Sequence, residues 1–86
     1  MTRQVNTPAH RAIITRYYGA TTYRPAKIIA RCWPNITAQV SYNDGLEPDR
    51  NHYLAAEKIM DKMQWDAPLY GGSLGNATYC WVMLQL

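Results

Sequence analysis

Apolar residues recur at helical spacing in one stretch of the chain, residues 46–65, LEPDRNHYLAAEKIMDKMQW. They are three or four positions apart and line one helical face: Tyr53, Ala56, Ile59, Met60 and Met63. The charged residues fall on the opposite face, which we expect to be turned to water: Arg50, Glu57, Lys58, Asp61 and Lys62. A single amphipathic helix of about sixteen residues is not stable alone in water, so the segment predicts a helix that packs on a sheet.

The start of this helix is marked by Pro48. Proline is tolerated in the first turn of a helix, because its missing N–H would have no partner there. Glu47 and Asp49 place negative charge at the positive end of the helix dipole. The sequence therefore predicts that the helix begins near Pro48.

Five shorter stretches are rich in β-branched and aromatic residues and predict strands: residues 12–18, 27–33, 36–42, 68–74 and 77–84. Alternation is clearest in residues 36–42, where every second residue is apolar. We expect a bulge at Gly71-Gly72 and a tight turn at Gly75-Asn76. The predicted fold class is α+β in the order β-β-β-α-β-β, with one amphipathic helix packed on a mainly antiparallel sheet of four to five strands.

The division of the chain follows from its length and from the pattern at its start. Residues 1–10 are polar and offer nothing to pack, so they predict a flexible tail. The remaining residues, 11–86, have the size of one domain with one modest core. The segment before residue 12 lacks the apolar run of a signal peptide, and no run reaches the roughly 20 apolar residues that span a bilayer. We expect a cytoplasmic protein with no membrane partner, either a monomer or a homodimer.

Charge is distributed unevenly along the chain. The first 43 residues carry six cations and no acid, whereas residues 44–66 hold all six acids against three cations. The net charge of +3 therefore conceals a polarised molecule, with a basic N-terminal sheet region and a mildly acidic helix.

The basic half of the chain interleaves cations with aromatic rings. The candidate binding residues are Arg16, Tyr18, Tyr23, Arg24, Lys27, Arg31 and Trp33. Surfaces that bind single-stranded nucleic acid have this composition, because cations meet phosphates and rings stack on bases. Hot spots of protein interfaces are also rich in Arg, Tyr and Trp, so a protein partner is equally compatible. The remaining alternative is that the arginines only keep the sheet soluble.

No catalytic or metal-binding constellation is visible. His52 has no Cys or carboxylate partners at metal spacing, so we interpret it as a structural histidine near the helix start. Cys32 and Cys80 are expected to be reduced and buried in the core, because a strand interior does not favour a reactive thiolate. The sequence predicts neither a catalytic residue nor a metal or cofactor. A deep pocket that held His52 beside a carboxylate would favour an enzyme.

Several motifs together resemble those of a family of small uncharacterised accessory proteins encoded by phages, plasmids and integrated mobile elements of bacteria. The matching residues extend from about Ile13 to Val82 and include Thr15-Arg16-Tyr17-Tyr18-Gly19, Asn51-His52, Ala55-Ala56-Glu57 and Tyr70-Gly71-Gly72-Ser73-Leu74. The chain departs from the family at Pro25-Ala26 and Trp33-Pro34-Asn35. The resemblance implies a mobile-element setting in a bacterial host cell and no particular mechanism.

These observations lead to two functional hypotheses. The first is a non-catalytic phage or mobile-element protein that binds and inhibits a host defence assembly, an inhibitor of the anti-CRISPR kind. The alternative is a small nucleic-acid-binding module that holds single strands on a basic-aromatic sheet surface.

Overall fold

A computed structural model of the protein describes residues 12–83. The predicted tail, residues 1–10, lies outside the described residues. The elements follow in the order β1 (Ala12–Tyr18), β2 (Lys27–Cys32), β3 (Ile36–Ser41), α1 (Pro48–Met63), β4 (Leu69–Gly75) and β5 (Thr78–Met83). The helix begins at Pro48, as predicted, and the strand boundaries lie within a residue of those expected.

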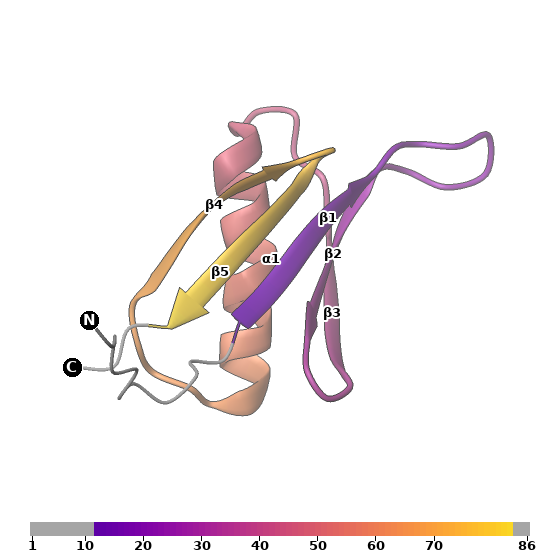
Figure 1. Ribbon diagram of the computed structural model, residues 1–86. Helices are drawn as coiled ribbons and strands as arrows, with labels where there is room; N and C mark the ends of the chain where they lie inside the picture. Colours follow the sequence, from indigo (N-terminus) through magenta and orange to yellow (C-terminus); the bar gives the residue numbers. More distant parts are fainter. Residues whose placement is uncertain (1–11, 84–86) are drawn as a thin grey trace.

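The five strands form one sheet in the spatial order β3-β2-β1-β5-β4, and every neighbouring pair is antiparallel. Helix α1 lies against one face of this sheet, and the long β1–β2 loop projects beyond the sheet (Figure 1). The predicted α+β class, with one helix on an antiparallel sheet, is confirmed. The first strand of the chain occupies the centre because β5 returns to pair beside it, a placement that no local sequence signal specified.

The buried face of α1 differs in part from the predicted stripe. Its buried residues are Asn51, His52, Ala55, Ala56, Ile59 and Met60. The prediction was wrong for Met63, which is 37% exposed. The helix ends there at a left-handed Gln64, and Trp65 folds back against the core. The buried face is therefore apolar toward its C-terminal end and polar in its first turn.

The core forms where α1 meets the inward residues of β1, β2 and β5. Ile13, Ile28 and Ile59 are fully buried at its centre. Trp81 is 8% exposed, and its cross-strand partner on the neighbouring strand β4 is Gly71. A Cβ atom at Gly71 would come within 2.4 Å of the indole ring, so this glycine makes room for Trp81.

The turn between β4 and β5 also differs in detail from the prediction. The two turn residues are Asn76 and Ala77, both at positive φ, rather than Gly75-Asn76. Two positive φ angles are what a type I′ hairpin turn requires, and its twist matches that of the strands. The irregular pairing lies between Ser73 and Gly75 and not at Gly71-Gly72, since Gly71 is held in register opposite Trp81.

Among residues 12–83, no helix is long and apolar enough to cross a membrane.

Candidate functional site

The sheet face that points away from α1 carries most of the predicted binding residues. Cross-strand partners share a face, so the pairing register places them on this side: Ile14, Arg16, Tyr18, Lys27, Ile29, Arg31, Tyr70, Cys80 and Val82. We call this surface the open face. None of the five strands carries an acidic residue.

Cations and aliphatic side chains alternate across the middle of the open face. Arg16 lies opposite Ile29, and Arg31 lies opposite Ile14. Ile14 is 46% exposed, a large value for a central strand. The open face therefore has an apolar centre with arginines on both sides of it.

Tyr18 belongs to the same surface at the end of β1. Its cross-strand partner on β2 is Lys27. The guanidinium carbon of Arg16 is 5.7 Å from the centre of the Tyr18 ring. At this distance the cation is attracted to the ring face. Tyr17 points the other way, toward α1, where its ring meets that of Tyr42 edge to face.

The other predicted residues lie at opposite ends of the sheet. Tyr23 and Arg24 occupy the β1–β2 loop, where the Thr21 hydroxyl accepts hydrogen bonds from the backbone N–H groups of both residues. Tyr23 is 93% exposed. Trp33 is 82% exposed in the β2–β3 turn, beyond the other end of β2. Since a strand of six residues spans about 20 Å, the seven residues form one extended surface and no compact site.

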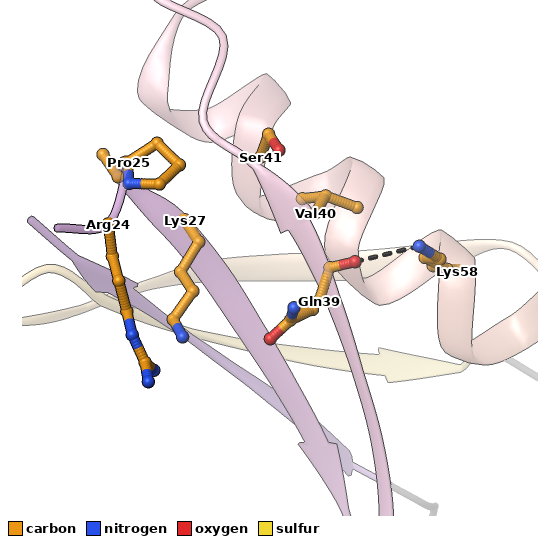
Figure 2. Close-up of a pocket in the computed structure, with 8 residues that line it drawn as sticks. Arg24, Pro25, Lys27, Gln39, Val40, Ser41 and Lys58 are labelled. Atoms are coloured by element: carbon orange, nitrogen blue, oxygen red, sulfur yellow. Dashed lines mark hydrogen bonds between the residues drawn. The ribbon is translucent and has the colours of Figure 1, made fainter. Parts of the chain in front are cut away.

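Three cationic residues line a hollow at the edge of the sheet, two of them on one side of β3 and the third on the helix at its other side (Figure 2). Arg24, Lys27 and Lys58 line it with Gln39, and its volume is about 460 Å³. Lys58 comes from α1, and its ammonium group donates a hydrogen bond of 3.0 Å to the backbone oxygen of Gln39. The basic surface therefore continues from the open face around the outer edge of β3.

The sequence interpretation assigned Lys58 and Lys62 only to a water-facing side of the helix. In the structure Lys62 also donates to β3, to the backbone oxygen of Thr37 at 3.2 Å. The two lysines are one helical turn apart and flank buried Ile59, a spacing that points both side chains at the neighbouring strand. Their ammonium groups satisfy carbonyls at an exposed strand edge, a position where lysine discourages pairing with other chains.

The two cysteines differ in position. Cys32 lies in the core at 4% exposure, as predicted. Cys80 is partly exposed and lies on the open face between Ile14 and Gly72. The expectation that Cys80 is a core residue was wrong, because β5 turns Trp81 and Met83 toward the helix and so turns Cys80 away from it.

His52 is 2% exposed and forms part of a buried polar cluster. Its Nδ1 atom is hydrogen-bonded to the Thr15 hydroxyl at 2.7 Å, and the indole N–H of Trp81 donates to the same hydroxyl at 3.1 Å. Burial lowers the pKa of His52, an effect larger than the opposite influences of Thr15 and Asp49. The histidine is therefore neutral at physiological pH.

His52 also lines a pocket of about 420 Å³, as does Tyr79. The carboxylate near this pocket is that of Asp49, which accepts a hydrogen bond from the Tyr79 hydroxyl, whereas His52 is hydrogen-bonded to Thr15. The arrangement lacks the direct bond from base to carboxylate that orients a catalytic histidine. Within residues 12–83, no three potential ligands of the His, Cys, Asp or Glu type gather into a metal site.

The sequence did not predict that Asn51 is a buried residue, yet its side chain is only 1% exposed. Its side-chain amide donates to the backbone oxygens of Asn43, Leu46 and Glu47, and its oxygen accepts the N–H of Asn43. It thereby connects the β3–α1 loop to the first turn of the helix.

Comparison of the chain with protein-family models, with curated proteins and with solved structures finds no match.

Proposed function

We propose that this is a non-catalytic binding protein that docks through its open face onto a protein partner with an acidic surface. The observation that carries the proposal is the apolar centre of this face, with Ile14 46% exposed and Val82 36% exposed. Arginines lie beside this centre. An apolar centre within a polar rim is the usual anatomy of a protein interface, and Arg and Tyr are frequent hot spots in such interfaces.

The charge of the open face supports an acidic partner. Arg16, Lys27 and Arg31 belong to strands that carry no acidic residue, so a basic partner would be repelled. The cationic hollow beside β3 extends the same sign of charge to Lys58. Carboxylates of a partner could pair with arginine in a bidentate manner, which favours a defined orientation.

The size of the surface indicates which loops take part. Five strands of about six residues give a flat area of about 20 by 24 Å. This area is smaller than the roughly 800 Å² that each partner buries in a standard interface. We therefore include the β1–β2 loop with Tyr23 and Arg24, and the turn with Trp33, whose large exposed rings would otherwise be unexplained.

The family resemblance suggests what the partner is. Proteins of phages and mobile elements work in the cytoplasm of a bacterial host, so the partner we propose is a host defence assembly whose action the protein inhibits. A nucleic-acid-guided effector is one such assembly.

A direct nucleic-acid-binding function is the second candidate. It is favoured by Tyr18, whose ring lies beside Arg16, and by Tyr23 in the projecting loop. Surfaces that bind single strands offer aromatic rings on which successive bases stack, whereas the middle of the open face is occupied by Ile14 and Ile29. The aliphatic centre is therefore our reason to prefer a protein partner.

The test uses charge reversal on the open face. Expression of the wild-type protein should restore phage growth in a host with an active defence assembly, and the assembly should copurify with it. The double variant Arg16→Glu/Arg31→Glu should weaken binding at least about tenfold, because each arginine contacts the partner. The control Arg50→Glu changes charge on α1 beside Tyr53 and should leave binding unchanged.

A titration with single- and double-stranded DNA and RNA, at low and at physiological salt, separates the two candidates. Binding that weakens steeply with salt and is lost in Arg24→Glu would favour the nucleic-acid function. Failure of every tested defence assembly to bind, with phage growth unchanged by expression, would overturn the inhibitor proposal.

A further inference from the structure

A second pocket lies on the helix side of the sheet, remote from the open face. Its walls come from the end of β1, the chain after β3, the first turns of α1 and the β4–β5 hairpin, and its volume is about 420 Å³. We call it the aromatic pocket, because three tyrosines and a histidine line it: Tyr17, Tyr42, Tyr79 and His52. A volume of this order is sufficient for a small organic ligand.

The rings of the aromatic pocket hold one another in place. Tyr17 and Tyr42 pack edge to face with their centres 4.9 Å apart. A second pair of lining residues, Tyr79 and His52, has ring centres 4.2 Å apart. Since His52 is bonded to Thr15 in the core, its ring cannot turn freely. The pocket is therefore lined by preorganised aromatic groups.

A carboxylate lies beside the aromatic pocket, in the first turn of α1. The Tyr79 hydroxyl donates to the carboxylate of Asp49, which places an anionic group one hydrogen bond from a wall of the pocket. Glu47 is the N-cap residue of the same helix, and together the two acids offset the positive end of the helix dipole. No Lys or Arg is among the residues that line the pocket.

We propose that the aromatic pocket binds an alkylammonium group. Faces of aromatic rings attract cations, and sites that recognise quaternary or methylated ammonium groups consist of several rings with a nearby carboxylate. The neutral imidazole of His52 places no positive charge against such a ligand. An anion would meet Asp49, and a neutral ligand of the same shape would lose the attraction to rings and carboxylate. The inference is independent of the proposed function, which uses the other face of the sheet.

The ammonium group could belong to a free small molecule or to a lysine side chain of a protein. The probes are therefore choline, spermidine and a short peptide that contains trimethyl-lysine. The control ligand is the uncharged carbon analogue of choline, in which a tert-butyl group replaces the trimethylammonium group. Binding is followed by two-dimensional amide NMR of the full chain and by the upfield shift of the ligand methyl protons, which aromatic rings induce.

We expect choline to shift the amide signals of residues around Tyr79 and Ala77, and the uncharged analogue to bind at least about tenfold more weakly. Asp49→Asn should reduce choline affinity by about tenfold, because it removes the charge while keeping a group that can bond to Tyr79. Asp61→Asn is the matched control, since it makes the same change at an exposed position about three turns further along α1. Preference for the peptide over choline identifies a lysine side chain as the source, and preference for choline or spermidine identifies a free cation.

Equal binding of choline and its uncharged analogue would overturn the proposal, as would an Asp49→Asn variant that retains full affinity. Absence of any shift at millimolar ligand would also overturn it. Tyr42→Ala provides a second variant in which the Asp49–Tyr79 bond is intact, and it should weaken choline binding. A folded Tyr42→Ala variant with unchanged affinity would exclude the pocket as the site.

Discussion

The two faces of the sheet use the same five strands under different constraints. On the helix side, Trp81, Thr15 and His52 meet in a buried hydrogen-bonded cluster. In the described part of the chain, no buried side-chain nitrogen or oxygen lacks a partner. On the open face, Ile14 and Arg16 are exposed, and the core does not enclose their side chains. The core and its hydrogen bonds thus lie on the helix side of the sheet, whereas the open face leaves large side chains in contact with solvent.

The largest difference between the two faces is expected at two neighbouring glycines, Gly71 on the helix side and Gly72 on the open face. A Cβ at Gly71 would lie 2.4 Å from the Trp81 ring and 2.5 Å from the backbone oxygen of Cys80, whereas a Cβ at Gly72 would meet nothing within 4 Å. Gly71→Ala should lower the free energy of unfolding by about 3 kcal/mol, because the core is overpacked. Gly72→Ala on the open face should change it by less than about 0.5 kcal/mol. Urea denaturation of both variants tests this pair, and equal effects would contradict the assignment of the two faces.

Substitution of Thr15 tests how much the buried polar cluster contributes to stability. Thr15→Val keeps the shape of the side chain but removes the hydroxyl that bonds both His52 and Trp81. Two buried polar groups would lose their partner, so we expect a loss of about 2 kcal/mol in the free energy of unfolding. Thr15→Ser retains the hydroxyl and should recover part of this loss. Thermal unfolding of the two variants measures the difference, and a Val variant as stable as wild type would contradict the role of the cluster.

The β4–β5 turn offers a change that should stabilise the protein. Ala77 has a φ of 56°, in the left-handed region where a Cβ is unfavourable. Ala77→Gly should raise the free energy of unfolding by about 1 kcal/mol, less the extra flexibility of glycine in the unfolded chain. Asn76→Gly is the matched comparison, since Asn tolerates a positive φ and should gain less. A destabilised Ala77→Gly variant in chemical denaturation would contradict the turn geometry.

A change of pH should have a smaller effect on the free energy of unfolding. Because burial lowers the pKa of His52, the unfolded chain binds a proton at this residue more readily than the folded protein does. The contribution to stability is therefore complete above about pH 6.5 and decreases as the pH falls below that value. His52→Gln should flatten this dependence between pH 7 and pH 5, measured by denaturant midpoints at each pH. An unchanged slope in the variant would show that other groups are responsible.

Local sequence patterns were sufficient for the elements and for the fold class. The helix from Pro48 was recognisable because proline, acids and the three-to-four spacing of Ala56, Ile59 and Met60 all indicate the same boundary and face. Alternation indicated β3. The uneven charge predicted a basic sheet and a mildly acidic helix. The five strands carry no acidic residue, whereas α1 itself balances three acids with three cations. Period-two spacing places Arg16 with Tyr18 on one face of β1, and Lys27 with Arg31 on one face of β2. The register between β1 and β2 then joins the two pairs on one surface.

The order of the strands and the partners of the buried polar residues depend on contacts between distant segments, so only the tertiary structure shows them. The order of the strands placed β1 at the centre, turned Cys80 to the open face and brought Lys58 to the edge of β3. His52 and Asn51 became core residues because Thr15 and the β3–α1 loop supply their hydrogen bonds, and those partners are 37 and 8 residues away in the sequence. A periodic pattern records which face of an element is apolar. It carries no information on which remote group will satisfy a buried polar side chain, and the aromatic pocket and the polar cluster depend on that pairing.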